Sequence, residues 1–173
     1  MEQRAIALLD QHGLMTIATL RADGWPQATM VNYANDGLLI YFLISRQSQK
    51  FANIRHDSRV SITVGRPYER VEDIKALSIA AFASELTDAA QRERAYQLLL
   101  ERHPAFSSFP KPDLAKAALM RAAPKLVSLI DFSRGFGHAD EITFAAGVTD
   151  MQPARADDWG PSPAVNRAHL TSA

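Results

Sequence analysis

A short run of hydroxyl and basic side chains follows an apolar segment that ends near residue 45. These side chains are Ser45, Arg46, Ser48 and Lys50, and they precede or open a short helix expected over 50–56. The first turn of a helix presents unpaired N–H groups and the positive end of the helix dipole, which hydroxyl and cationic side chains complete as an anion site. The pattern therefore fits a phosphate pocket. An ordinary helix capped by Ser48, with its basic residues in solvent, fits the same pattern.

A polar segment over 132–141 carries two glycines around Phe136, followed by His138. Glycine lets the backbone turn sharply or approach a ligand closely. The sequence around Phe136 lacks the third glycine and the βαβ setting of a dinucleotide fingerprint. From such a turn His138 could reach a flavin edge, a substrate or a haem iron, because imidazole serves as acid, base and metal ligand. An ordinary hydrogen-bonding loop residue is the other interpretation, and both stay open.

Composition excludes several classes of protein. The chain has no cysteine, which removes disulfide scaffolds, thiolate zinc sites, iron–sulfur clusters and cysteine nucleophiles. Its 19 basic and 19 acidic residues give a formal net charge of zero, so no global basic field favours nucleic acid. The five histidines show no metal-ligand spacing, and no metal site is expected. No apolar run reaches the ~20 residues of a membrane span or the pattern of a signal peptide, so we expect a cytoplasmic protein without nucleic-acid or membrane partners.

Three short strands joined by tight turns are expected to support the basic run. Residues 2–12 predict a helix ended by Gly13, and strands follow over 14–21, 27–33 and 38–44. Asp-Gly pairs separate the strands, and such pairs favour two-residue hairpin turns. The three strands therefore predict an antiparallel meander.

The second half of the chain inserts helices between further strands. Strands are expected over 59–65, 75–86, 125–132 and 142–146, and helices over 88–103 and 113–122. This order lacks parallel βαβ alternation and indicates a mainly β fold with inserted helices (α+β), whose antiparallel strands form a closed or partly closed barrel. We expect one domain over 1–148 and an extended C-terminal tail over 149–173, which is poor in large apolar residues.

The run from Leu14 to Gly65 resembles the FMN-binding core of the pyridoxamine 5′-phosphate oxidase-like family, the FMN-binding split barrels. The order and spacing of several short pieces carry the resemblance: Thr16-Ile-Ala-Thr-Leu, Gly24-Trp-Pro-Gln-Ala-Thr, Leu38-Leu-Ile-Tyr-Phe, Ser48-Gln-Lys50, Asn53-Ile54 and Ser58-Arg-Val-Ser-Ile. The resemblance implies a six-stranded antiparallel split β-barrel of the FMN-binding type. It also implies a homodimer that holds FMN at its interface.

The resemblance also implies which residues hold the cofactor. Ser48 and Lys50 would meet the FMN phosphate. Gln49 stands where the family often has arginine, which weakens the phosphate grip, and Arg46 is a candidate to replace it. The expected ring and ribityl contacts come from two strands, with Thr29, Met30, Val31 and Asn32 beside the isoalloxazine ring, and Phe42 and Leu43 along the ribityl chain and ring.

The partner subunit would supply the second half of such a site, and Lys75 is a candidate for it. Related haem-utilisation split barrels carry a histidine in a C-terminal segment of the kind that holds His138. An exposed charge at a strand end is the other interpretation of Lys75.

These inferences converge on an FMN-binding, oxidoreductase-like protein with a small-molecule substrate or redox partner, in which the flavin performs the redox chemistry. No catalytic side chain is identified. True pyridoxamine-phosphate oxidation is not expected, because residues 165–173 do not resemble the Arg-rich C-terminal signature of that enzyme. Two alternatives remain: a haem-binding protein that uses His138, and a non-catalytic module that binds flavin or a deazaflavin.

Overall fold

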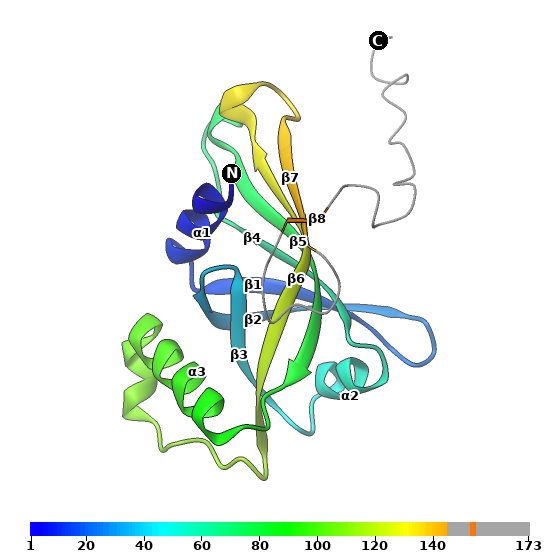
Figure 1. The fold of residues 1–173 in the computed structure, drawn as a ribbon, viewed down its shortest axis with the longest axis vertical. Coiled ribbons are helices and arrows are strands. Elements are labelled where there is room, and N and C mark those ends of the chain that lie inside the picture. The colour runs from blue at the N-terminus through cyan, green and yellow to red at the C-terminus, as the bar shows by residue number, and fades with distance from the viewer. Residues whose placement is uncertain (145–152, 155–173) are drawn as a thin grey trace.

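Six antiparallel strands close into a barrel in the computed structural model, which describes residues 1–144 and 153–154 (Figure 1). The sheet order is β3-β2-β1-β4-β5-β6, and pairing between β3 and β6 closes it. β7 and β8 extend the sheet beyond β6. The predicted six-stranded antiparallel split barrel is confirmed. The strands are β1 (Leu14–Leu20), β2 (Pro26–Asp36), β3 (Leu39–Ser45), β4 (Arg59–Gly65), β5 (Lys75–Glu85), β6 (Ala117–Asp131), β7 (Ala139–Phe144) and β8 (Pro153–Ala154).

The core follows from side chains that alternate between the two faces of each strand. In β4, residues alternate between exposed and buried along the whole strand. β3 is apolar on both faces because its two faces meet different partners. Ile40, Phe42 and Ile44 fill the barrel, whereas Tyr41 and Leu43 pack beneath a helix on the outside.

Three α-helices cover the barrel, namely α1 (Glu2–Asp10), α2 (Gln49–His56) and α3 (Ala89–Arg102). Ser48 caps α2, as one interpretation of the sequence had it, and Asp88 caps α3, each by accepting a hydrogen bond from a first-turn amide. Short 3₁₀ turns connect other elements: η1 (Val71–Asp73), η2 (Pro104–Ser108) and η3 (Phe132–Arg134). No helix in the described part of the chain is long and apolar enough to cross a membrane.

Two hairpin glycines behave as predicted and a third does not. Gly24 and Gly37 have φ angles of 83° and 59°, which the turns between β1, β2 and β3 require. The expected helix-ending role of Gly13 is wrong, because α1 ends at Asp10 and its C-cap is Gln11, which has a right-handed conformation. Gly13 instead allows a close approach: a Cβ there would lie 2.5 Å from Cε1 of His103.

The helix predicted over 113–122 is wrong, since only a single turn follows Asp113 and β6 begins at Ala117. Alanine-rich sequence favours helix locally, but tertiary pairing overrides that preference here. The first part of β6 pairs with β3 and closes the barrel, and the last part pairs with β7. Pro124 lies where the β5–β6 register shifts, a position that tolerates its missing N–H.

The strand expected over 142–146 corresponds to β7, which starts three residues earlier and ends at Phe144. The predicted tail over 149–173 lies outside the described residues, apart from the two residues of β8. Residues 165–173, on which the exclusion of pyridoxamine-phosphate oxidation rests, also lie outside them.

Candidate functional site

A cavity of about 380 Å³ lies where β2, the end of β3 and the start of α2 meet α3 and η2. Seven of the residues predicted for the cofactor site line this cavity: Met30, Val31, Asn32, Leu43, Ser45, Ser48 and Lys50. They come from two strands and a helix start that are adjacent in the chain. The fold therefore brings the predicted ring strand and the predicted phosphate residues together.

The start of α2 is built by a short turn after β3. Ser48 Oγ donates to the carbonyl oxygen of Ser45 at 2.7 Å and accepts from Phe51 N at 3.3 Å. The amides of Gln49 and Lys50 stand in the first turn, where no intrahelical acceptor exists for them. The side chain of Lys50 has no hydrogen bond or ion pair within the described part of the chain. An unpaired cation, two hydroxyls and a helix N-terminus thus share one cavity, and this chemistry binds anions.

Arg46 does not join these groups. Its guanidinium forms an ion pair with Glu85, donates to the carbonyl oxygen of Leu114 at 2.8 Å, and lies 5.4 Å from the ring centre of Phe51. These contacts tie the end of β3 to β5 and to the connection before β6. The structure therefore gives Arg46 a structural role, and its side chain does not line the cavity at α2.

A buried amide, to which the sequence analysis gave no role beyond the family resemblance, fixes α2 against the barrel. Asn53 is 1% exposed, and its Nδ2 donates to Thr19 Oγ1 at 2.9 Å and to Gln27 Oε1 at 3.0 Å. Gln49 Nε2 donates to Asn53 Oδ1 at 2.9 Å, so Gln49 supports the helix, and it does not line the cavity at α2. The sequence feature that could have predicted this role is the position of Asn53, an amide next to the apolar Ile54 in a short helix.

Two of the residues predicted for the ring and ribityl contacts, Thr29 and Phe42, do not line the cavity. Phe42 is fully buried in the barrel core, so its side chain packs the core and does not line the cavity. Thr29 Oγ1 is buried and has no hydrogen-bond partner in the described part of the chain. The opposite wall comes from residues that sequence analysis assigned only to a helix and a connection: Tyr96, Leu99 and Phe106.

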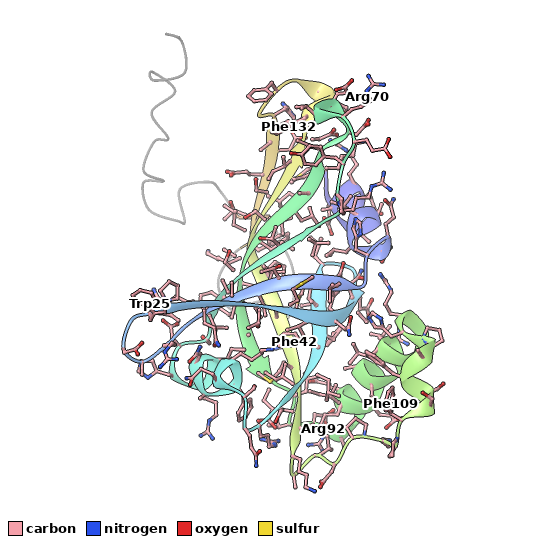
Figure 2. All side chains as sticks on the ribbon, turned by 180° about the vertical axis from the view of Figure 1, so that it is seen from behind. Trp25, Phe42, Arg70, Arg92, Phe109 and Phe132 are labelled. Carbon is pink, nitrogen blue, oxygen red and sulfur yellow. The ribbon has the colours of Figure 1, made fainter. Side chains whose placement is uncertain are left out.

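The start of β5 and the β6–β7 hairpin lie at the end of the barrel away from α2 (Figure 1), and Phe132 marks this end in Figure 2. Lys75 is the first residue of β5, and His138 directly precedes β7. Lys75 is exposed at the start of β5, opposite Asp131. His138 Nε2 lies 3.2 Å from Asp140 Oδ1. Within one chain, neither residue reaches the cavity at α2.

The charges at the hairpin end are paired with one another. Arg4 contacts Asp131 at 2.5 Å and Asp140 at 3.0 Å, and Arg134 also pairs with Asp140. Hydrogen bonds from Ser133, followed by the nearby Lys75 and Arg4, lower the pKa of Asp131. Each carboxylate there already has cationic partners, as expected for a structural network.

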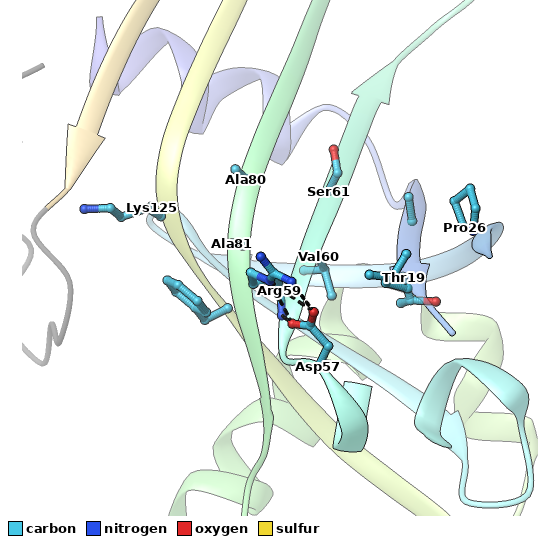
Figure 3. Close-up of a pocket in the computed structure, with 12 residues that line it drawn as sticks. Thr19, Pro26, Asp57, Arg59, Val60, Ser61, Ala80, Ala81 and Lys125 are labelled. Carbon is cyan, nitrogen blue, oxygen red and sulfur yellow. Dashed lines mark hydrogen bonds and ion pairs between the residues drawn. The ribbon is translucent and has the colours of Figure 1, made fainter. Parts of the chain in front are cut away.

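The outer face of the sheet carries a larger, apolar hollow of about 540 Å³ over β1, β4 and β5 (Figure 3). Its floor consists of small uncharged side chains, including Ala18, Ser61 and Ala80. Arg59 and Asp57 form an ion pair at its rim, and this pairing lowers the pKa of Asp57 to about 2. The outward residues of β1, β4 and β5 around the hollow are uncharged from Thr16 to Leu20, from Ser61 to Gly65 and from Ala76 to Phe82.

In the described residues, no group of three or more histidine or acidic side chains is placed to hold a metal ion. The cavity at α2 instead presents hydroxyl, amide and ammonium donors, which is the chemistry of an anion site.

Comparison with known proteins bears on the fold and the family. The family model described as pyridoxamine 5′-phosphate oxidase matches residues 1–131. No curated protein sequence matches this chain. A haem-binding protein from Mycobacterium smegmatis superimposes with a TM-score of 0.68 at 22% identity; the match covers 82% of this chain but only 56% of that protein.

Two further solved structures share the fold. A provisionally assigned pyridoxamine 5′-phosphate oxidase from Listeria innocua has a TM-score of 0.62 at 21% identity, covering 74% of this chain and 96% of that one. An F420 reductase has a TM-score of 0.55 at 24% identity, covering 68% and 90%. These structures share one barrel but carry different cofactor names, so the likeness establishes architecture alone.

Proposed function

This chain belongs to the pyridoxamine 5′-phosphate oxidase family, and from that membership we propose that it is an FMN-binding oxidoreductase whose flavin is held by its phosphate at a homodimer interface. The observation that carries the proposal is Lys50, a cation without a side-chain partner among the described residues, beside Ser45, Ser48 and the first amides of α2 in one cavity. A phosphate group would accept hydrogen bonds from these donors together, with Ser48 turning toward it the proton that it donates here to the carbonyl oxygen of Ser45. The residues present therefore fit the phosphate end of FMN.

The protein's part in the chemistry is binding and orientation. Bound FMN supplies hydride or electron transfer. Ser48 and Lys50 anchor the phosphate, and Asn53 keeps α2 seated so that these donors stay in place. Met30 and Asn32 project outward from β2 beside the anchor, where they contact the ring, while Leu43 and Tyr96 limit the access of water.

The second copy of the chain is proposed to dock on the outer face of β1, β4 and β5. This face carries small uncharged side chains, an apolar hollow of about 540 Å³ and Phe82, which is 45% exposed. Contiguous exposed apolar surface of this kind marks association sites. In this proposal Lys75 and His138 of the second copy complete the shared site, since neither lines the cavity at α2 in its own chain.

Haem binding through His138 is the second candidate, and one observation favours it. The carboxylate of Asp140 contacts Nε2 of His138 at 3.2 Å and leaves Nδ1 without a partner in the described structure. A carboxylate on one imidazole nitrogen orients the other toward a metal. This candidate predicts a Soret band on haem titration that disappears in His138→Ala and persists in the exposed control His56→Ala.

A visible-absorption titration with FMN tests the proposed function. The wild-type protein should give the perturbed flavin band near ~450 nm, and Lys50→Ala should weaken binding about 10- to 100-fold, because a charged hydrogen bond contributes about 1.5–3 kcal/mol. Arg55→Ala is the control, since Arg55 is exposed on the same helix. Absence of flavin binding in the wild type would overturn the proposal and leave haem titration as the next experiment.

A further inference from the structure

A third cavity, of about 610 Å³, lies on the other side of Met30 from the cavity at α2. Met30 lines both cavities, and it faces Thr16 across the β1–β2 ladder. Thr16 in turn pairs with Thr63 across β1 and β4. These three side chains form a continuous outward row, which makes the floor of the cavity.

Two chain connections form the walls above this floor. One is the link between α1 and β1, which contributes His12, and the other is the segment after β4, which contributes Arg66. Neither side chain has a hydrogen bond or salt bridge among residues 1–144. The lining residues include no carboxylate. Two basic groups thus face one cavity with nothing of opposite charge to neutralise them.

The electrostatics at His12 agree with this geometry. Partial burial, followed by the charge of Arg66, lowers the pKa of the His12 imidazole. The other charged side chains nearby, Asp10 and Arg102, pair with each other, and Arg102 also donates to the backbone carbonyl of His12. A bound anion would offset the repulsion between His12 and Arg66, and His12 would then take up a proton.

We propose that His12 and Arg66 bind the anionic group, a carboxylate or a phosphate, of the molecule that exchanges electrons with the flavin. The identity of that molecule as a redox substrate rests on the proposed function, because Met30 joins this cavity to the one at α2. The anion site itself rests only on the lining of its own cavity. Thr16 and Thr63 offer hydroxyl donors to the same group from the floor.

The test measures the pKa of His12 by NMR in the full-length protein, with its signal assigned from a His12→Gln variant. Inorganic phosphate and acetate serve as separate probes, against sodium chloride at equal ionic strength. Binding should raise the pKa of His12 by about one unit, with no comparable change at the exposed His56. A response to phosphate alone indicates a phosphate-bearing molecule, and a response to both probes indicates that carboxylates also bind.

Arg66→Gln should abolish the response, whereas Arg70→Gln removes the same charge from the same loop and should leave it intact. Equal responses in both variants, or no response in the wild type, would overturn the proposal. Lys50→Ala separates the two inferences. If Lys50→Ala responds normally while the wild-type protein binds no FMN, the proposed function fails and the anion site stands.

Discussion

The two ends of the barrel use charge in opposite ways. At the α2 end, Lys50 has no side-chain partner in the described residues and faces a cavity with two hydroxyls. At the hairpin end, Arg4, Arg134 and Asp140 satisfy one another. An unpaired cation beside a cavity is free to bind an anionic ligand, whereas a network of mutually paired charges stabilises a turn. The comparison favours the α2 end as the phosphate anchor and gives the paired charges of the hairpin end a role in holding the turn.

The comparison also shows what the fold does with one long strand. β6 connects both ends, because its first half closes the barrel beside β3 and its second half supports the β7 hairpin. The two ends are therefore rigidly linked but far apart in one chain (Figure 1). A site that uses residues from both ends requires two copies.

The largest expected effect tests that requirement. Ser61→Arg adds a guanidinium among the small uncharged side chains on the floor of the hollow, and burying it without a partner in an interface costs about 3–5 kcal/mol. The dissociation constant of the dimer should rise about 100-fold or more, as measured by sedimentation velocity over a dilution series. Thr87→Arg, on the exposed connection before α3, is the control. A wild-type protein that is monomeric and still binds FMN fully would refute the shared site.

A second prediction compares the two ends directly. Lys50→Ala should weaken FMN binding about 10- to 100-fold, whereas Asp140→Asn should change it less than about twofold, because Asp140 belongs to the closed network. Flavin fluorescence quenching measures both affinities. A larger loss of FMN affinity in Asp140→Asn than in Lys50→Ala would indicate that the hairpin end, and not the α2 end, binds the phosphate.

A third prediction concerns how α2 is held. Asn53→Ala leaves buried polar groups on Thr19 and Gln27 unpaired, so the free energy of unfolding should fall by about 2 kcal/mol. Urea unfolding measures the change. Gln97→Ala removes a comparable helical amide contact, to Glu93, but at an exposed position, and should cost less than about 0.5 kcal/mol. Equal losses in the two variants would contradict the account of Asn53.

The smallest expected effect is the pH dependence of the hairpin end. The native pKa of Asp131 lies below its unfolded value, so its stabilisation is present above about pH 4 and is lost as pH falls through the native pKa. Asp131→Asn should therefore flatten the fall in Tm between pH 5 and pH 3 by about 2–5 °C. Asp73→Asn, at an exposed position, should follow the wild type. If the Tm of Asp131→Asn fell between pH 5 and pH 3 as steeply as that of the wild type, this network would not cause the loss of stability at acid pH.

Local sequence signals predicted the elements with local causes. The Asp-Gly turns, the Ser48 cap and the alternating strands each depend on neighbouring residues, and each was found where expected. The prediction for the start of β6 was wrong because its alanines favour helix locally. Only its pairing with β3, which is far away in the sequence, makes this segment a strand.

The candidate site divides in the same way. Ser48 and Lys50 could be predicted as site residues because they lie at a helix start. Met30 to Asn32 could be predicted because their segment resembles a strand of the family's FMN-binding core. Tyr96 and Phe106 could not be predicted as lining residues, because only the tertiary packing of α3 and η2 brings them to the cavity. The ion pair between Arg46 and Glu85 could not be predicted either, because it joins residues that are 39 positions apart in the sequence.

The most direct test of the central claim is the ratio of affinities for FMN and for riboflavin, which lacks the phosphate. If the α2 end anchors the phosphate, the wild-type protein should bind FMN about 100-fold more tightly than riboflavin, and Lys50→Ala should lose most of that preference. Equal affinity for the two flavins in the wild type, or an undiminished preference in Lys50→Ala, would show that the cavity at α2 is not the phosphate site.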